Sequence, residues 1–291
     1  MSVRQRLLVI GAHGFIGAHV ARAAEGRFQC IPAARKECEL AIDITDPASV
    51  ASAFQKARPQ VVALAAGMAD IDRCQREPAI ARETNVVGVW HVAKECAHSG
   101  ARLLFVSSGA VFDGTCEEYR EDSRPNPVSV YGASKAKAEE IVTGLSPGSV
   151  IARLSLVLGF PLRPGSNALL ERLLPAMRSG AEVRAPADEY RNAIDVETVT
   201  RWILDLAGDP EARGIFHLGS SDALARYEIV RELAHALDFP RERVVPDFGP
   251  RSSRAPRGRH ELLVPKRIQE VSSVAVPTCR QAIERCTHAI A

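Results

Sequence analysis

A glycine-rich turn directly after the first apolar run constrains the fold more than any other feature of the chain. Leu7–Ile10 is a short run of branched apolar residues, which is typical of a strand buried on both faces. Gly11, Gly14 and Gly17 follow at a spacing of three, and a helical pattern then runs from Ala18 to Glu25. Glycines at this spacing permit a tight turn, close approach of the backbone to a pyrophosphate, and close packing of the helix on the strand. The order strand, turn, helix therefore predicts an α/β fold whose first turn binds a dinucleotide.

Strand and helix patterns alternate through the first half of the chain. Further strands are predicted at 28–33, 40–42, 60–65, 102–107 and 149–153, and helices at 46–57, 78–99 and 129–144. Asp46 is suited to cap its helix with Pro47 at the first position, and Gly100 to end the long helix. Repeated βα units predict a doubly wound parallel sheet of the Rossmann type with right-handed crossovers.

The regular alternation of strand and helix patterns ends after about Ser155, and glycines and prolines cluster between residues 159 and 165. Helices are predicted at 167–179, 196–207 and 226–237, with a strand at 214–219 that rejoins the main sheet. We therefore expect a dinucleotide-binding domain over residues 1–155, rejoined by 192–219. Residues 156–191 and 220–291 are expected to form a smaller C-terminal substrate-binding lobe.

Composition argues against several classes of function. The net charge is +2 and aromatic residues make up only 5%, and neither value favours a nucleic-acid-binding or membrane-binding surface. No apolar segment reaches the ~18 residues of a membrane span. The seven cysteines are scattered and none forms a Cys-x-x-Cys pair. We therefore expect reduced thiols in a cytoplasmic protein, with neither a disulfide framework nor a metal site.

A tyrosine and a lysine four residues apart provide the main chemical signal. Tyr131 and Lys135 fall in the helical pattern over 129–144, so both side chains are expected on one face, one turn apart. A neighbouring cation stabilises a phenolate, so Lys135 and a nearby nicotinamide charge are expected to lower the pKa of Tyr131 from its usual ~10. The pair would then act as a general acid/base. The same spacing also occurs in ordinary surface pairs, so the assignment of Tyr131 and Lys135 as an acid/base pair depends on the glycine-rich turn and on the strand that ends at Ser108.

Ser108 stands at the end of an apolar strand pattern over residues 103–106. In an open α/β sheet, ligands bind at the carboxyl ends of the strands. A serine there is often only part of a turn, but the following Tyr131 and Lys135 favour a role in the chemistry.

Together these segments resemble the extended short-chain dehydrogenase/reductase superfamily, closely over residues 5–160 and more loosely beyond. Residues 127–135, Pro-Val-Ser-Val-Tyr-Gly-Ala-Ser-Lys, are similar to the P-x-S/N-x-Y-G-x-S-K pattern of its members. Within the superfamily, the dTDP-4-dehydrorhamnose reductases are the most similar group. The segments that carry this likeness are 43–46, 58–62, 83–88, 111–114 and 191–196.

The resemblance implies a role for each matching residue. Tyr131 would protonate the C4 oxygen of a keto-sugar, Lys135 would hold the nicotinamide ribose, and Ser108 would hydrogen-bond the reacting oxygen. The cofactor-binding residues implied are Gly11, Gly14 and Gly17 along the pyrophosphate, the backbone amides of His13, Phe15 and Ile16, Asp43 and Ile44 at the adenine, and Ala65, Ala66 and Gly67 beside the cofactor. The resemblance also implies a nucleotide-sugar substrate and a homodimer.

The chain departs from the reductase pattern directly after Ser108. Gly109 and Ala110 stand where the rhamnose reductases usually have an acid and an aromatic residue. Their small size puts the rhamnose precursor in doubt and argues against 4,6-dehydratases, which usually need two carboxylates there. A nucleotide-sugar 4-epimerase therefore stays open. So does a non-catalytic, NADP-binding regulatory subunit like the methionine adenosyltransferase beta subunit.

Two basic segments bear on the ligands. Arg35 and Lys36 stand about where an acid would bond the adenosine ribose of NAD; a basic residue there suits the 2′-phosphate of NADP, although Glu37 is close and NAD stays possible. The stretch Arg251–Arg267 is strongly basic. It either binds an anionic group such as a diphosphate or is a solvated loop.

Overall fold

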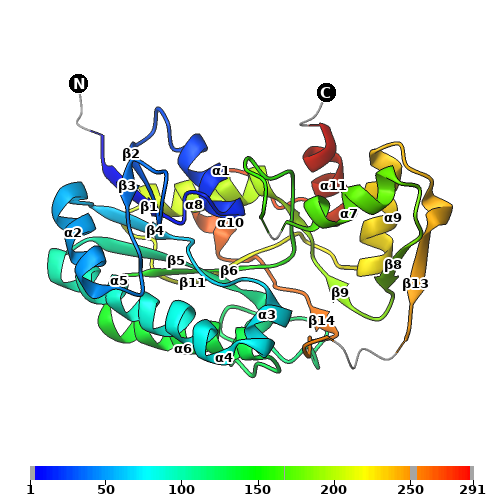
Figure 1. Ribbon diagram of the computed structural model, residues 1–291, viewed down its shortest axis with the longest axis horizontal. Helices are drawn as coiled ribbons and strands as arrows, with labels where there is room; N and C mark the ends of the chain where they lie inside the picture. Colours follow the sequence, from blue (N-terminus) through cyan, green and yellow to red (C-terminus); the bar gives the residue numbers. More distant parts are fainter. Residues whose placement is uncertain (1–3, 167, 250–253, 289–291) are drawn as a thin grey trace.

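A parallel β-sheet lies at the centre of the computed structural model, which describes residues 4–166, 168–249 and 254–288 (Figure 1). Its strands are β1 (Arg6–Ile10), β2 (Gln29–Ala34), β3 (Leu40–Ala41), β4 (Val61–Leu64), β5 (Arg102–Ser108), β6 (Val150–Leu154) and β11 (Gly214–Leu218). Within the described residues they form one seven-stranded sheet in the order β11-β6-β5-β4-β1-β2-β3, with every neighbouring pair parallel. The predicted doubly wound parallel sheet is confirmed, and β11 adds its outer edge next to β6.

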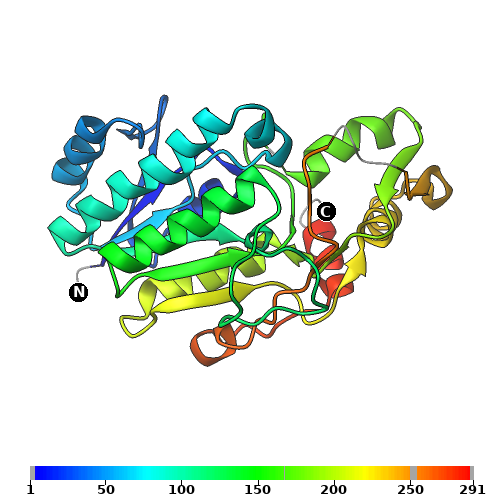
Figure 2. The ribbon, with the colours of Figure 1, turned by 90° about the horizontal axis from the view of Figure 1, so that it is seen from below.

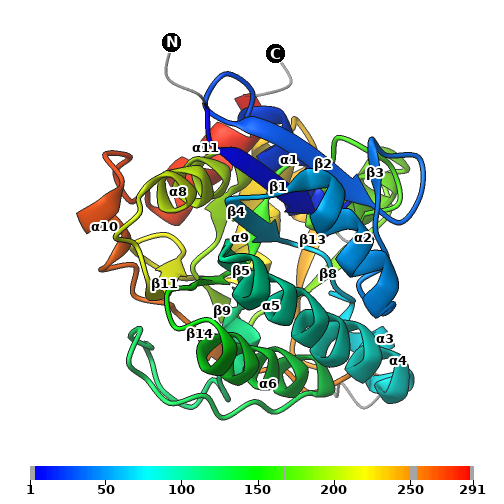
Figure 3. The same cartoon turned by 90° about the vertical axis from the view of Figure 1, so that its left-hand side faces the viewer.

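Helices cover both faces of the sheet (Figure 3). One face carries α1 (Phe15–Ala23) and α8 (Val196–Gly208), and the other carries α2 (Pro47–Ala57), α5 (Gly88–Ser99) and α6 (Val130–Leu145). Strand β1 shows why its sequence is apolar throughout. Leu7 and Val9 pack in the core with α1 and α8, whereas Leu8 and Ile10 pack in the core with α2, α5 and α6. Side chains that alternate along a strand are thus buried on both faces.

The long helix predicted at 78–99 is present, but it is built from three consecutive pieces. These are α4 (Pro78–Arg82), a π-helical turn η1 (Glu83–Val87) and α5, preceded by the short α3 (Ile71–Arg76). The π turn carries Asn85, whose amide nitrogen donates to the Met68 carbonyl and whose oxygen accepts from the Met68 N–H. These bonds fix the segment after β4 at the edge of the sheet where the strands end.

The chain after residue 155 adds a smaller lobe beside the sheet (Figure 2). Its main elements are α7 (Leu169–Arg178), β8 (Val183–Pro186), α9 (Arg226–Ala236), β13 (Val244–Asp247) and α11 (Cys279–His288). They enclose two further apolar clusters that are separate from those of the sheet. The helices predicted at 167–179 and 226–237 correspond to α7 and α9, although residue 167 lies outside the described residues. The chain after residue 155 also contains the short elements β7 (Val157–Leu158), β9 (Tyr190–Arg191), β10 (Ile194–Asp195), β12 (Leu224–Ala225), η3 (Arg241–Arg243), β14 (His260–Glu261) and α10 (Ile268–Val271), which were not predicted.

The segment 258–263 returns from the lobe to the end of the sheet. The Arg191 guanidinium donates to the carbonyls of Gly258 and Arg259, and the Asn192 amide bonds both the N–H and the carbonyl of Leu263. Leu263 is fully buried against Phe112 and Tyr119. The carboxyl-terminal part of the chain therefore helps to wall the region around the end of β5.

Candidate functional site

A cavity of about 590 Å³ opens where the strands of the sheet end. It brings together eight of the residues predicted from the sequence, namely Phe15, Ile16, Ala65, Ala66, Gly67, Ser108, Tyr131 and Lys135. Seven other predicted residues do not line it: Gly11, His13, Gly14, Gly17, Arg35, Asp43 and Ile44. The first group includes all three predicted catalytic residues. The second lies in the turn before α1, in the first turn of α1, or near the ends of β2 and β3.

The turn between β1 and α1 has the shape that its glycines predict. Gly11 has φ +96°, a conformation that favours glycine, and a Cβ on it would lie 2.6 Å from the Ala66 nitrogen. A Cβ on Gly17 would lie 2.1 Å from the Gly11 carbonyl oxygen. Gly14 is the N-cap of α1 and supplies no side-chain cap, so the first N–H groups of the helix are left for another acceptor. A pyrophosphate fits this arrangement of a tight turn and a helix N-terminus.

The predicted adenine-side residues lie close together near β2 and β3. Arg35 is exposed directly after β2. The N–H and hydroxyl of Thr45 donate to Asp43, and with the more distant Arg35 charge they hold the pKa of Asp43 below its usual value. Ile44 is buried and lies against Gly88, where a Cβ would meet it at 2.8 Å. The Ile44 side chain therefore belongs to the core.

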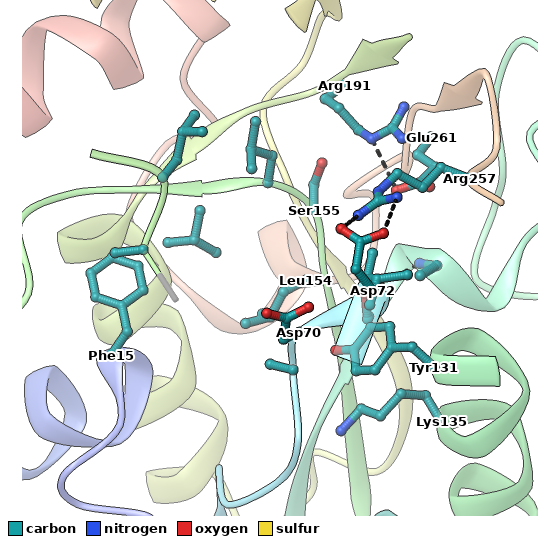
Figure 4. A pocket seen from close by; sticks show the side chains of 18 of the residues that line it. Phe15, Asp70, Asp72, Tyr131, Lys135, Leu154, Ser155, Arg191, Arg257 and Glu261 are labelled. Carbon is teal, nitrogen blue, oxygen red and sulfur yellow. Dashed lines mark hydrogen bonds and ion pairs between the residues drawn. The ribbon is translucent and has the colours of Figure 1, made fainter. Parts of the chain in front are cut away.

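Tyr131 and Lys135 project from α6 toward the same side of the cavity (Figure 4). Ser129 caps the helix by accepting from the Gly132 N–H at 3.1 Å, which fixes the first turn. The Lys135 Nζ donates to the Val106 carbonyl at 2.6 Å and lies 4.3 Å from the centre of the Phe105 ring. The ammonium is thus held against β5, two residues before Ser108.

Burial sets the ionisation of both side chains. It raises the pKa of Tyr131 to about 12, and the hydrogen bond with Ser108 acts in the opposite direction. Burial also lowers the pKa of Lys135 to about 8, while the Glu139 carboxylate raises it. The pKa of Tyr131 is therefore raised and not lowered as expected, because loss of hydration disfavours the phenolate. At neutral pH the tyrosine is a neutral phenol, the form that donates a proton.

Charged side chains of the lobe and of α3 cover the cavity on the side above Tyr131 (Figure 4). Arg257 forms a two-pronged ion pair with Asp72, with distances of 3.1 and 2.8 Å. The hydrogen bond from Arg257 is the main reason why the pKa of Asp72 falls to about 2. Arg191 pairs with Glu261 at 3.1 Å, and burial nevertheless raises the pKa of that carboxyl. These pairs join elements that are far apart in the sequence.

The basic stretch predicted at Arg251–Arg267 divides between two environments. Arg254 and Arg257 line the cavity. Arg267 instead donates to the backbone carbonyls of Arg213 and Ile215, and its guanidinium lies 4.3 Å from the centre of the Phe216 ring. Arg251 lies outside the described residues. Neither the anion-binding nor the solvated-loop interpretation therefore applies to the whole stretch.

The small residues after Ser108 leave less empty space than their size suggests. A Cβ on Gly109 would lie 3.3 Å from the Leu263 side chain, and Ala110 lines the cavity. The Glu261 carboxyl, two residues before Leu263, lines the same cavity. The carboxyl-terminal segment thus fills part of the room that Gly109 leaves and brings a carboxyl group into the site.

Several cavity residues were missed as site residues in the sequence. They are Asp70, Asp72, Asn85, Arg172, Arg191, Arg226 and Glu261, with others of the lobe. Asn85 and Arg191 lie in segments that carry the family resemblance, and this resemblance was the only sequence signal that could have identified them as site residues. In the described part of the chain, no cluster of three or more histidine, cysteine, aspartate or glutamate side chains is arranged to hold a metal. Among the described helices, none is both long and apolar enough to span a membrane.

Comparison with known families agrees with this geometry. Residues 5–291 match the family described as the RmlD substrate binding domain. The chain belongs to this family. The predicted relationship to the extended short-chain dehydrogenase/reductase superfamily is confirmed.

Curated relatives and solved structures cover most of the chain. The methionine adenosyltransferase 2 subunit beta of Xenopus tropicalis is 29% identical over 251 residues, covering 83% of this chain and 75% of that protein. A dTDP-4-dehydrorhamnose reductase from Bacillus anthracis, solved with NADP, has a TM-score of 0.89 at 22% identity and covers 99% of both chains. The UDP-glucose 4-epimerase of Thermus thermophilus, solved with NAD, has a TM-score of 0.83 at 21% identity and covers 98% of both chains. At these identities the two structures show a shared fold.

Proposed function

We propose that the protein reduces the keto group of a nucleotide-linked 4-keto sugar with NADPH. The observation that carries this proposal is the meeting of Ser108, Tyr131 and Lys135 in one cavity with Phe15 and Ile16 of the glycine turn. A hydroxyl, a phenol and an ammonium at the carboxyl end of a parallel sheet are the groups that carbonyl reduction needs beside a dinucleotide.

The dinucleotide fits the chain on structural grounds. The uncapped start of α1 offers N–H groups to the pyrophosphate, and the close approach of Gly11 to Ala66 leaves no room for a side chain in the turn. Arg35, exposed at the end of β2, is suited to the 2′-phosphate of NADP. Small residues Ala65, Ala66 and Gly67 line the cavity beside the turn and leave space for the cofactor to pass.

Each of the predicted side chains has a separate role in the proposed reduction. The cofactor supplies the hydride when it is bound. Ser108 would hydrogen-bond the carbonyl oxygen, and Tyr131 would donate the proton to that oxygen. Lys135 would hold the ribose hydroxyls and favour the phenolate left after proton transfer. Asp43 and the backbone near Ile44 would lie at the adenine.

The lobe after residue 155 would bind the nucleotide part of the substrate. Arg172, Arg184 and Arg254 line the cavity away from the sheet, and Arg172 has no ion-pair or hydrogen-bond partner among the described residues. Guanidinium groups suit a diphosphate because they donate paired hydrogen bonds. We accordingly assign residues 1–155 and 192–219 to the cofactor domain, and residues 156–191 and 220–291 to substrate binding.

The test uses purified protein, NADPH and a dTDP-linked 4-keto-6-deoxyhexose, with loss of cofactor absorbance as the signal. The expected result is turnover that falls by about 10³-fold or more in Tyr131→Phe, because the proton donor is lost, while NADPH affinity changes little. Tyr190→Phe is the matched control, since Tyr190 stacks on His260 and does not line the cavity. Undiminished turnover in Tyr131→Phe would contradict the assigned acid. Inversion of a UDP-hexose without net cofactor consumption would favour the epimerase alternative.

A regulatory subunit is the second candidate. It is favoured by the 29% identity to a methionine adenosyltransferase beta subunit and by the absence of the acid and aromatic residue at positions 109 and 110. Stoichiometric co-purification with a catalytic partner, NADP binding, and no turnover of any 4-keto nucleotide sugar would support this candidate over the reductase.

A further inference from the structure

One face of α6 carries three polar side chains at equal intervals. Tyr131, Lys135 and Glu139 stand at positions i, i+4 and i+8, so they lie in a row along the helix. Lys135 and Glu139 are both buried. Only the first two have a role in the proposed reduction, so the third needs an explanation.

The end of β5 meets this row residue by residue. The Val106 carbonyl accepts from Lys135, the Ser107 hydroxyl donates to Glu139 Oε1 at 2.5 Å, and Ser108 bonds Tyr131. Three consecutive residues of one strand thus contact three turns of one helix. A shift of α6 along β5 would disturb all three contacts together.

Glu139 is also fixed to the next strand of the sheet. The Arg153 Nε donates to Oε1 at 3.0 Å, and a terminal guanidinium nitrogen donates to Oε2 at 2.7 Å. Arg153 belongs to β6 and is only 1% exposed. The carboxylate therefore joins α6, β5 and β6 at a buried point below the cavity.

Stability alone does not account for such a pair. Burying two charges costs solvation that their attraction often only balances, and well-packed apolar residues frequently serve as well. We propose that Glu139 is a positioning residue that holds Lys135 and Ser108 in register through Ser107 and Arg153. This inference rests on the proposed function, because it gives Lys135 and Ser108 their roles.

The charge of Glu139 also acts on Lys135. Among the groups that face the ammonium, Cys74 of α3 is a buried thiol whose pKa burial raises to about 11, so it is neutral near pH 7. β5 presents the Val106 carbonyl and the Phe105 ring, β6 presents Arg153 behind the carboxylate, and Tyr131 on the same helix is a neutral phenol. Glu139 is therefore the neighbouring group that favours the charged form of Lys135 against burial.

The experiment follows NADPH affinity from pH 6 to 10 in the wild type and in the double variant Glu139→Met with Arg153→Met. Replacing both partners avoids an unpaired buried charge and retains packing. The affinity should fall as Lys135 loses its proton, and the midpoint should move down by about one pH unit or more in the double variant. Glu140→Gln is the control on the same helix, because Glu140 is exposed and pairs with Lys137, and its midpoint should match the wild type.

A milder change guards against a variant that does not fold. Ser107→Ala removes one hydrogen bond to Glu139 without changing charge, and it should move the midpoint in the same direction by a smaller amount. If the double variant folds and its NADPH affinity falls with the same pH midpoint as in the wild type, the proposal is overturned. If the double variant does not fold, an unchanged pH midpoint in Ser107→Ala overturns the proposal instead.

Crystal structures of these variants separate this inference from the proposed function. The expected result is a Lys135 Nζ that leaves the Val106 carbonyl, together with a displaced Ser108. Retention of both positions in the absence of Glu139 would refute positioning. If the wild type binds no NADPH at any pH, the proposed function fails, and the crystal structures alone decide whether Glu139 positions these side chains.

Discussion

Two glycines in α6 predict opposite effects of the same substitution. A Cβ on Gly132 would lie 2.0 Å from the Ala110 carbonyl oxygen and 2.9 Å from the Pro127 Cβ. A Cβ on Gly144, in the last turn of the helix, would meet nothing within 4 Å. Alanine is the better helix former at both positions, so the difference between the variants measures the close approach of α6 to the segment after Ser108.

The magnitude follows from these contacts. Forcing extra atoms into a packed site lowers the free energy of unfolding by about 1–3 kcal/mol, and the higher helix propensity of alanine offsets up to about 1 kcal/mol of this loss. Gly132→Ala should therefore lower the free energy of unfolding by about 1–2 kcal/mol, which corresponds to a fall in Tm of about 2–3 °C for a chain of this size. Gly144→Ala should raise the free energy of unfolding by about 0.5–1 kcal/mol.

The assay is urea unfolding followed by circular dichroism, with thermal melts as a second measurement. Relief of the clash moves Tyr131 away from Ser108, so Gly132→Ala should also reduce turnover while Gly144→Ala leaves it unchanged. If Gly132→Ala proves as stable as Gly144→Ala, the tight contact between α6 and the Ala110 carbonyl does not exist in solution and the reasoning fails.

Three further predictions test other parts of the structure. Asp72→Asn should lower the free energy of unfolding by about 1 kcal/mol at pH 7, since it breaks the partly exposed pair with Arg257. The folded-state pKa of Asp72 is lowered to about 2, so the stability difference between the wild type and Asp72→Asn should be constant above pH 4 and vanish as pH falls toward 2. Urea titrations that give the same stability difference at pH 7 and at pH 2 would contradict this prediction. Arg35→Ala should weaken binding of NADPH about tenfold and leave NADH unaffected, and equal losses for both cofactors in fluorescence titrations would argue against a 2′-phosphate contact. Exposed Cys116 should react rapidly with a thiol reagent at pH 8, whereas buried Cys74, with its pKa raised to about 11, should react only after unfolding; rapid labelling of both by mass spectrometry would show the burial to be wrong.

Local signals in the sequence predicted the sheet and the placement of Ser108, Tyr131 and Lys135 in one cavity. Buried parallel strands such as β1 and β5 are continuous apolar runs, and the helical spacing of Tyr131 and Lys135 placed both on one face of α6. Their convergence with Ser108 followed from a general rule, since the carboxyl ends of parallel strands share one edge.

The charged side of the cavity was not predictable in this way. Asp72 meets Arg257, and Arg191 meets Glu261, across long stretches of chain. The strands that carry Arg191 and Glu261 are two residues long and have no readable periodicity. The direction of the Tyr131 pKa was also missed, because it depends on burial by residues from several elements rather than on the neighbouring lysine.

The contact between Gly109 and Leu263 has a consequence for how the protein is made. Leu263 is held by Asn192 and closes the space beside the end of β5. Six of the seven described strands of the sheet lie in the first 154 residues, but this wall must wait until nearly the whole polypeptide has been synthesised. A product of premature termination before residue 258 would retain the glycine turn and Tyr131 but expose Gly109, Phe112 and Tyr119 to water.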